Sequence, residues 1–160
     1  MVPGPNGPLH DDTAREPVVS STPPGPVVLY DGVCGLCNRY VRFVLERDRR
    51  RQFRFASLQG AFGARALARH GMHLDGDPTS IVLLESPGSL HERAFVRSDA
   101  VLSIMMGLGG PWRLAAGLRV IPRFLRDGIY DLVARGRYRI FGRLDSCSLP
   151  PRPDAARFLG

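Results

Sequence analysis

Cysteine is scarce in this sequence, with three residues of this type among 160. So small and odd a number excludes a domain held together by several disulfides. Two of the cysteines, Cys34 and Cys37, are separated by two residues, whereas Cys147 lies far along the chain. A close pair with a distant single cysteine suits a redox or metal-binding role in a reducing compartment. We therefore expect a cytoplasmic protein.

Long apolar runs are also missing. No stretch reaches the ~18 uncharged apolar residues that indicate a membrane-spanning helix. The longest candidate, Ala100–Trp112, contains three glycines and a proline and is followed by Arg113. The first residues lack the charged start and apolar run of a secretory signal peptide. The sequence therefore predicts no transmembrane segment and agrees with a cytoplasmic location.

Lysine is absent, and all 22 basic residues are arginine. They give a net charge of +7, and a positive balance suits nucleic acid, an anionic membrane surface or acidic partners. The arginines are spread through the chain, however, and are not interleaved with aromatic residues in one block as a nucleic-acid site would favour. We therefore expect no nucleic-acid partner.

The composition is that of an ordinary globular domain, with 44% hydrophobic and 23% charged residues. Residues 1–26 are rich in Pro, Gly, Ser and Thr and contain few large apolar residues, so we expect a flexible leader. The predicted domain spans residues 27–150 and includes a C-terminal helical extension. Residues 151–160 are expected to be a tail.

Hydrophobic periodicity predicts alternating strands and helices in this domain. A strand, a helix and a second strand come first, an order that implies a parallel pair with a right-handed crossover. A tight turn at 86–89 joins two later strands, which are expected to be antiparallel. The fold class is α/β, a mixed sheet of four strands flanked by helices, with extra C-terminal helices. The predicted strands are 27–31, 52–58, 80–85 and 90–96, and the predicted helices are 35–50, 60–70, 98–106, 112–120 and 124–141.

Two details concern the C-terminal helices. Ser98 is a residue type that commonly caps a helix start, so it is expected to cap the helix that follows it. The last helix carries an apolar stripe at helical spacing, and such a stripe usually packs against the core. The stripe consists of Leu125, Ile129, Leu132, Val133 and Ile140.

The most specific feature is the cysteine pair at the junction between the first strand and the first helix. Residues three apart on a helix lie on one side, about 5–6 Å apart at Cβ, and a disulfide needs Cα atoms about 4.4–6.8 Å apart. Unpaired N–H groups and the helix dipole at a helix start stabilise a thiolate. Cys34 is therefore the predicted nucleophile, and Cys37, one turn in and less exposed, is the predicted resolving thiol. Gly35 allows a partner's backbone to approach the sulfurs.

Asp31 precedes Cys34 by three residues and has two interpretations. It is either a partly buried carboxylate that exchanges a proton with a cysteine, or a turn residue whose side chain accepts hydrogen bonds from the following N–H groups. Cys147 has three interpretations: a third redox thiol, a zinc ligand, or a buried small side chain.

The order of elements and the position of the cysteine pair resemble those of a thioredoxin-like domain. More specifically, the sequence resembles the thiol-disulfide oxidoreductase DCC family, named for an Asp-x-x-Cys-x-x-Cys motif that is here Asp31, Cys34 and Cys37. The similarity extends over Val27–Pro150. Further stretches that look like the family are 53–59, 97–100, 109–112, 121–122, 126–127, 137–142 and 145–150.

This resemblance implies a thioredoxin-like fold and thiol-disulfide exchange by Cys34 and Cys37, with a role for Asp31. In thioredoxin-like proteins, a cis-proline before the third strand faces the active cysteines and offers a backbone edge to the substrate. Pro78 occupies that place, as this cis-proline or as a trans turn residue. The candidate substrate-binding residues are Gly35, Leu36, Pro78 and Thr79.

Three functions are therefore weighed. The first is an enzyme without a cofactor that exchanges a Cys34–Cys37 dithiol with a protein or small-molecule thiol or disulfide, using an electron donor that the sequence does not identify. The second is a structural zinc module that combines the three cysteines with a His or Asp, although the sequence has only one C-x-x-C. The third is a non-catalytic interaction domain that uses the region from Met105 to Arg143.

Overall fold

The computed structural model describes residues 25–72, 81–144 and 152–160. The leader expected at residues 1–26 therefore falls almost entirely outside the described residues. The described strands are β1 (Val27–Tyr30), β2 (Arg54–Ser57), β3 (Ile81–Glu85), β4 (Arg93–Val96) and β5 (Phe158–Leu159). The helices are α1 (Gly35–Arg47), α2 (Ala61–Arg69), α3 (Arg97–Leu108) and α4 (Arg123–Phe141), with two 3-10 helices, η1 (Gly110–Val120) and η2 (Arg152–Arg157).

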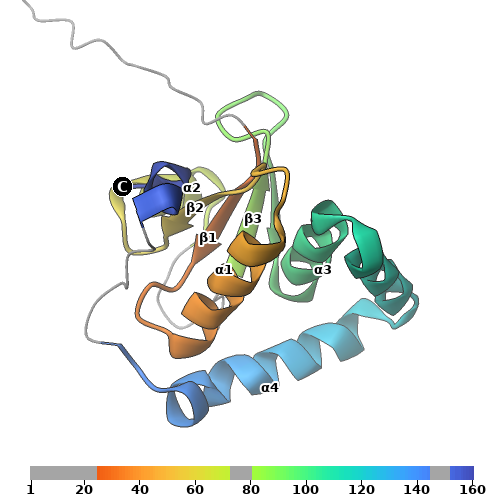
Figure 1. Cartoon of the computed structure of the whole chain (residues 1–160). Helices are drawn as coiled ribbons and strands as arrows, with labels where there is room; N and C mark the ends of the chain where they lie inside the picture. Colours follow the sequence, from red (N-terminus) through yellow and green to blue (C-terminus); the bar gives the residue numbers. More distant parts are fainter. Residues whose placement is uncertain (1–24, 73–80, 145–151) are drawn as a thin grey trace, which may run out of the picture.

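The strands form one mixed sheet in the order β4-β3-β1-β2-β5 (Figure 1). Strand β1 is central, parallel to β2 and antiparallel to β3, with Val28 opposite Phe55 on one side and Leu83 on the other. Strands β3 and β4 are antiparallel, as their short connection predicts. The α/β class, the mixed sheet and the additional C-terminal helices are confirmed.

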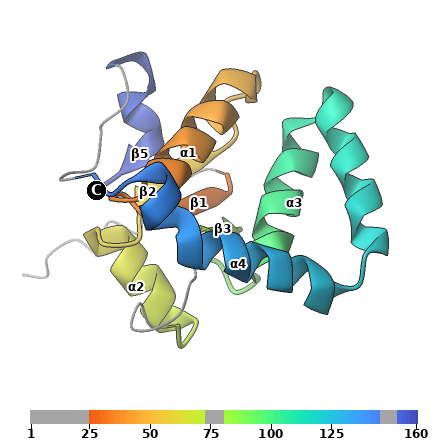
Figure 2. The ribbon, with the colours of Figure 1, turned by 90° about the horizontal axis from the view of Figure 1, so that it is seen from below.

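The sheet is covered on both faces, which explains why β1 is apolar throughout. Val28 and Tyr30 pack with residues of α1 and α3 on one face. Val27 and Leu29 point to the other face and pack against α2. Figure 2 shows α1 and α3 on one side of the sheet and α2 on the other. All four residues of β1 are buried, so the strand that leads to the cysteine pair is held rigidly.

The sheet has five strands rather than the four expected. The fifth, β5, comes from the segment expected to be a tail, and it pairs in parallel with β2. Phe158 stacks on Phe55 with ring centroids 5.2 Å apart. Arg157, just before the strand, is 1% exposed. A two-residue strand has no alternating pattern to reveal it, so periodicity did not indicate this strand.

Helix α4 lies across the end of α1 at which the cysteines are found (Figure 1). The prediction that the apolar stripe of α4 packs against the core is wrong, because Leu132 and Ile140 are 73% and 71% exposed. The buried residues of α4 are Ala134 and Arg137. The side of α4 that faces the core is therefore the side that carries Arg137 and its polar contacts, and not the side that carries the apolar stripe.

The start of α3 also differs from expectation. The helix begins directly after β4, with Val96 at the N-cap, so Ser98 lies inside its first turn and is not the cap. The Ser98 hydroxyl instead donates a hydrogen bond to Asp127 of α4. Ser98 thus joins α3 to α4.

None of the helices in the described ranges is both long and apolar enough to span a bilayer.

Candidate functional site

The loop from β1 to α1 places the two cysteines together at the start of a helix. Cys34 is the N-cap of α1, with extended backbone angles, and its Sγ accepts a hydrogen bond from the N–H of Cys37 at 3.5 Å. Both cysteines are free thiols. The sulfur of Cys34 therefore takes the position in which a capping oxygen normally binds the unpaired N–H groups of a helix.

In this geometry the pKa values of the two thiols shift in opposite directions. The pKa of Cys34 is lowered from 9.0 to about 6, mainly by a hydrogen bond from the Cys37 thiol. Burial of Cys34 opposes this shift, and hydrogen bonds from the N–H groups of Cys37 and Leu36 add to it. The hydrogen bond from the Cys37 thiol, together with burial and the charges of Cys34 and Asp31, raises the pKa of Cys37. Near neutral pH the pair therefore holds one thiolate, on Cys34, and one proton, on Cys37.

Asn38 fixes the loop that carries the cysteines. Its Nδ2 donates to the carbonyl oxygens of Gly32 at 2.8 Å and Cys34 at 2.9 Å. The side chain is almost completely buried. Because a buried amide with good hydrogen bonds rigidifies its surroundings, Asn38 keeps the turn before α1 in one conformation.

Asp31 is buried directly beneath this loop and accepts hydrogen bonds from three distant side chains. Gln59 Nε2 donates to its Oδ1 at 2.9 Å. Arg137 and Tyr138 of α4 both donate to Oδ2, the guanidinium at 3.3 Å. The N–H of Val33 also donates to Oδ1, at 3.2 Å. Asp31 therefore joins the cysteine loop to the end of β2 and to α4.

These contacts decide the charge of Asp31. Burial opposes its ionisation, but the hydrogen bonds from Tyr138, Gln59, Val33 and Arg137 outweigh burial and lower the pKa of the carboxyl. The carboxylate consequently stays ionised near neutral pH and is a poor carrier of protons. Its hydrogen bond from Val33 is the turn contact expected of an aspartate in this position.

The cysteines are covered by the chain that follows α4. We call Gly142–Leu144 the covering segment. Gly142 O accepts from the N–H of Gly35 at 3.3 Å, and the N–H of Leu144 donates to Val33 O at 2.8 Å. Arg143 and Cys34 form an isolated antiparallel bridge. Cys34 is 0% exposed and Cys37 is 1% exposed, so Cys34 is not the more exposed thiol that the sequence predicts.

Gly35 allows this close contact. A Cβ at this position would lie 2.2 Å from the carbonyl oxygen of Phe141. Replacing Gly35 with Ala is therefore expected to force the covering segment away from Cys34 and to destabilise the fold by about 1–3 kcal/mol. Alkylation of Cys34 under native conditions, measured by mass spectrometry, should become faster.

Gly128→Ala is a matched control on α4, because a Cβ there meets nothing within 4 Å. It should leave the alkylation rate unchanged and stabilise the helix slightly. An unchanged alkylation rate in Gly35→Ala would show that Gly142–Leu144 does not control access to Cys34.

An apolar cavity of about 170 Å³ lies beside Cys37, between α1, α3 and α4. Leu36 and Tyr40 of α1 contribute to its lining, with Val101 of α3 and Val133 of α4. Leu36, a candidate substrate-binding residue, thus lies next to Cys37, whereas Gly35 faces Phe141 and Gly142.

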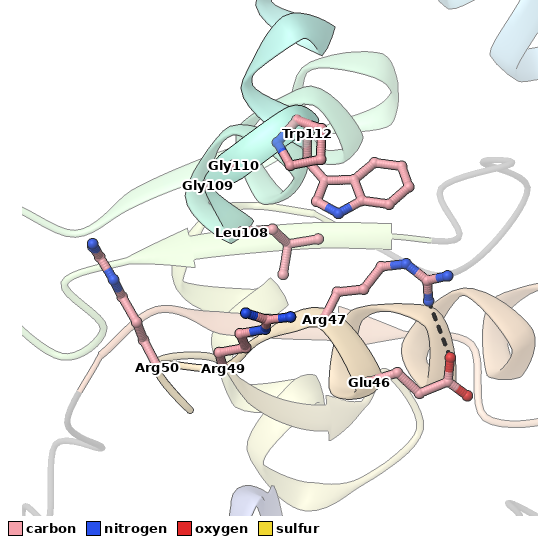
Figure 3. Close-up of a pocket in the computed structure, with 9 residues that line it drawn as sticks. Glu46, Arg47, Arg49, Arg50, Leu108, Gly109, Gly110 and Trp112 are labelled. Atoms are coloured by element: carbon pink, nitrogen blue, oxygen red, sulfur yellow. Dashed lines mark hydrogen bonds and ion pairs between the residues drawn. The ribbon is translucent and has the colours of Figure 1, made fainter.

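A larger cavity, of about 430 Å³, lies at the opposite end of α1. Figure 3 shows Leu108 and Trp112 on one side of it and Arg47, Arg49 and Arg50 on the other. A helix of this length is about 20 Å long, so this basic cavity is separate from the thiols.

Three predicted residues, Pro78, Thr79 and Cys147, lie outside the described residues. Within the described ranges, no group of three or more His, Cys, Asp or Glu side chains has a geometry that would hold a metal ion.

Sequence reasoning did not assign Gln59, Arg137 or Tyr138 to the site. Gln59 follows β2, and the carboxyl ends of the parallel pair β1 and β2 meet at one edge of the sheet, so its position was a usable signal. Arg137 and Tyr138 are more than 100 residues from Asp31 in sequence. Their only signal was that they belong to a stretch resembling the family named above.

Comparison with known proteins agrees with this geometry. A family model described as DCC1-like thiol-disulfide oxidoreductase matches residues 28–143. A chloroplastic DCC family protein of Arabidopsis thaliana is 45% identical over 125 residues, which cover 78% of this chain and 69% of the relative. The uncharacterized protein YuxK of Bacillus subtilis is 35% identical over 136 residues, 85% of this chain and 95% of the relative. No solved structure matches significantly.

Proposed function

This chain belongs to the DCC1-like thiol-disulfide oxidoreductase family, and from that premise we propose that it exchanges disulfides through Cys34 and Cys37. The observation that carries the proposal is the unequal acidity of the two thiols at the start of α1. A thiolate is the attacking species in disulfide exchange. A neutral thiol one turn further along is suited to the second step.

The proposed reaction transfers two electrons. The Cys34 thiolate attacks a substrate disulfide, forms a mixed disulfide and releases one substrate thiolate. Cys37 then gives its proton to the substrate thiolate released in the first step and attacks the Cys34 sulfur, which forms the Cys34–Cys37 disulfide and releases the second substrate thiolate. The substrate is reduced and the protein is oxidised. A dithiol reductant restores the free cysteines by the same steps in reverse.

Substrate access in this proposal requires the covering segment to move. Gly142–Leu144 is held to the cysteine loop by two backbone hydrogen bonds, each worth about 1 kcal/mol. An extended substrate chain offers the same backbone groups and is proposed to take the place of this segment, as a strand added to an edge. The exchange of similar hydrogen bonds keeps the cost of opening low.

The remaining predicted residues have defined places in the proposal. Asp31 acts as a positioning residue that holds the cysteine loop through its hydrogen bond from Val33, and its charge raises the pKa of both cysteines. Gly35 and Leu36 lie beside the substrate, and Pro78 and Thr79 remain predicted substrate contacts. Cys147 follows the covering segment by three residues and remains a candidate third thiol. We propose a cytoplasmic location, supported by the low cysteine content.

The ionisation of Cys34 tests the proposal directly. Ultraviolet absorbance of the thiolate should appear with a midpoint near pH 6, and Cys34→Ser should abolish this transition. Cys37→Ala removes the principal donor to the thiolate, so it should move the midpoint to higher pH. A wild-type midpoint near the ordinary value of 9.0 would contradict the proposal.

The same shift affects stability. The folded protein releases the Cys34 proton at lower pH than the unfolded chain does. The contribution of this group to the free energy of unfolding therefore grows between about pH 6 and pH 9 and is lost as the pH falls through 6.

A second candidate, the non-catalytic interaction domain, is favoured by one observation. Helix α4 and η1 expose large apolar residues, among them Leu114, Phe124 and Leu132. Large exposed apolar areas are typical of a surface that binds another molecule. A Cys34→Ala, Cys37→Ala double variant with normal cellular activity would favour this function over the enzyme.

A further inference from the structure

We propose that the cavity beside Cys37 is a specificity pocket for an apolar, ring-sized group attached next to the sulfur of the substrate. This inference rests on the proposed disulfide exchange and names its substrate class. The shared chemistry is a hydrophobic thiol or disulfide. It has two sources: a protein cysteine next to a Phe or Leu side chain, and a small aromatic thiol.

The size of the cavity sets the size of the group. Its volume is about 170 Å³, and an apolar cavity of about 150 Å³ in another protein accepts benzene. A phenyl ring or a branched aliphatic side chain therefore fits. The cavity also lies between three helices, so its walls come from elements that are fixed by the core.

The chemistry of the lining selects against polar groups. Among the residues that the structure describes, no charged side chain lines the cavity, and the surface they give it is almost entirely carbon. The Tyr40 hydroxyl already donates to the carbonyl oxygen of Val101 at 3.4 Å. A polar group placed here would lose its hydrogen bonds to water and gain few in return. The basic cavity at the other end of α1 differs, because three arginines and Glu46 contribute to its lining.

The position of the cavity connects it to the reaction. Cys37 is part of its wall, and in the proposed second step the Cys37 sulfur attacks the mixed disulfide on Cys34. A group attached next to the substrate sulfur therefore lies within reach of the cavity at that step. Val133, at the rim, is 43% exposed, so the cavity opens toward solvent on the α4 side.

The experiment compares matched disulfides with the wild-type protein. Two peptide disulfides differ only in Phe or Ser beside the cysteine, and two small disulfides carry either a benzyl or a hydroxyethyl group. The apolar member of a pair should have a kcat/KM at least about tenfold higher. A preference in the peptide pair alone identifies a protein substrate, and one in the small pair alone identifies a small aromatic thiol. Equal values in both pairs would overturn the inference and leave the proposed exchange standing.

Variants on α4 test whether the preference for apolar disulfides depends on this cavity. Val133→Gln places an amide at the rim of the cavity and should bring the ratio of the two kcat/KM values close to one. Leu132→Gln is the matched control, because Leu132 is 73% exposed and does not line the cavity. The control should keep the wild-type ratio. Loss of the preference in both variants, or in neither, would contradict a pocket at this place.

A binding measurement separates the inference from the proposed exchange. Benzene added to Cys34→Ser protein should shift the methyl resonances of Ile81 and Val101, which line the cavity. The methyl resonances of Leu108, in the basic cavity, should stay in place. If wild-type protein exchanges no disulfide, the proposed function fails, yet these shifts still show an apolar binding site. Unshifted Ile81 and Val101 resonances would overturn the inference.

Discussion

Replacing Cys34 with Ser is expected to abolish disulfide exchange, with a fall in rate of about a thousandfold or more, since loss of a nucleophile removes the whole reaction path. A serine hydroxyl does not ionise near neutral pH and forms no mixed disulfide. Burial and the charge of Asp31 remain in this variant and still raise the pKa of Cys37, so Cys37 is a poor substitute for the attacking thiolate. The measurement is the rate of reduction of a peptide disulfide in the presence of a dithiol reductant.

Cys37→Ser provides the complementary result. It keeps the Cys34 thiolate but removes the resolving sulfur, so the first step should proceed and then stop. The protein should accumulate with a mass increase equal to one substrate half, located on Cys34 by peptide mapping. A Cys34→Ser protein that reduces the substrate at the normal rate would refute the assignment. A lower rate in Cys147→Ser would give the third thiol a part in the reaction.

Replacing Arg157 with Ala is expected to lower the free energy of unfolding by about 3–5 kcal/mol, the cost of leaving a buried charge without its partner. The Arg157 guanidinium donates to Asp48, which is buried to a similar degree, and its Nε donates to Phe53 O at 3.1 Å. It also lies over the ring of Phe55, 5.3 Å from the centroid. Its loss would detach β5 from the sheet edge.

Urea-induced unfolding followed by circular dichroism measures this effect. Arg123→Ala is the matched control, because Arg123 is 61% exposed and its partners Asp99 and Asp127 each keep another hydrogen bond. It should cost less than about 1 kcal/mol. Combining Arg157→Met with Asp48→Asn leaves no charge behind and should cost less than Arg157→Ala alone. Equal losses for Arg157→Ala and Arg123→Ala would show that the buried pair contributes no more than a surface pair.

The local part of the fold was predictable from sequence because short-range physics determines it. An apolar run followed by Asp31-Gly32 and two cysteines at helical spacing is enough to predict strand, turn and helix. The parallel pairing of β1 and β2 follows from the single crossover between them. These elements bring Cys34 and Cys37 together, so the centre of the site was evident before any coordinates.

The surroundings of the cysteines were not predictable in the same way. The contacts of Asp31 with Arg137 and Tyr138 depend on how α4 is rotated about its axis. Periodicity favoured burial of the stripe that includes Leu132, but the buried carboxylate of Asp31 requires partners, and those lie on another side of the helix. An unpaired buried charge costs several kcal/mol, more than burying one exposed leucine returns.

The burial of Cys34 also depends on a contact between segments far apart in the sequence, the cysteine loop and Gly142–Leu144. The sequence predicts that the missing side chain of Gly35 lets a substrate backbone approach the cysteines. In the structure, the protein's own backbone at Gly142 occupies this space. Contact with a substrate and contact with Gly142 both require the absence of a Cβ at Gly35. The sequence therefore indicates that Gly35 is contacted closely, but not that Gly142 makes the contact.

The backbone over Cys34 has a further consequence for damage by peroxide. Conversion of a thiolate to sulfenic and then irreversible sulfinic acid requires the oxidant to reach the sulfur. A thiolate as acidic as this one would be vulnerable on an open surface. We therefore expect the resting protein, with Gly142–Leu144 over Cys34, to resist peroxide better than an uncovered thiolate of equal acidity, and to be oxidised only while the segment is displaced.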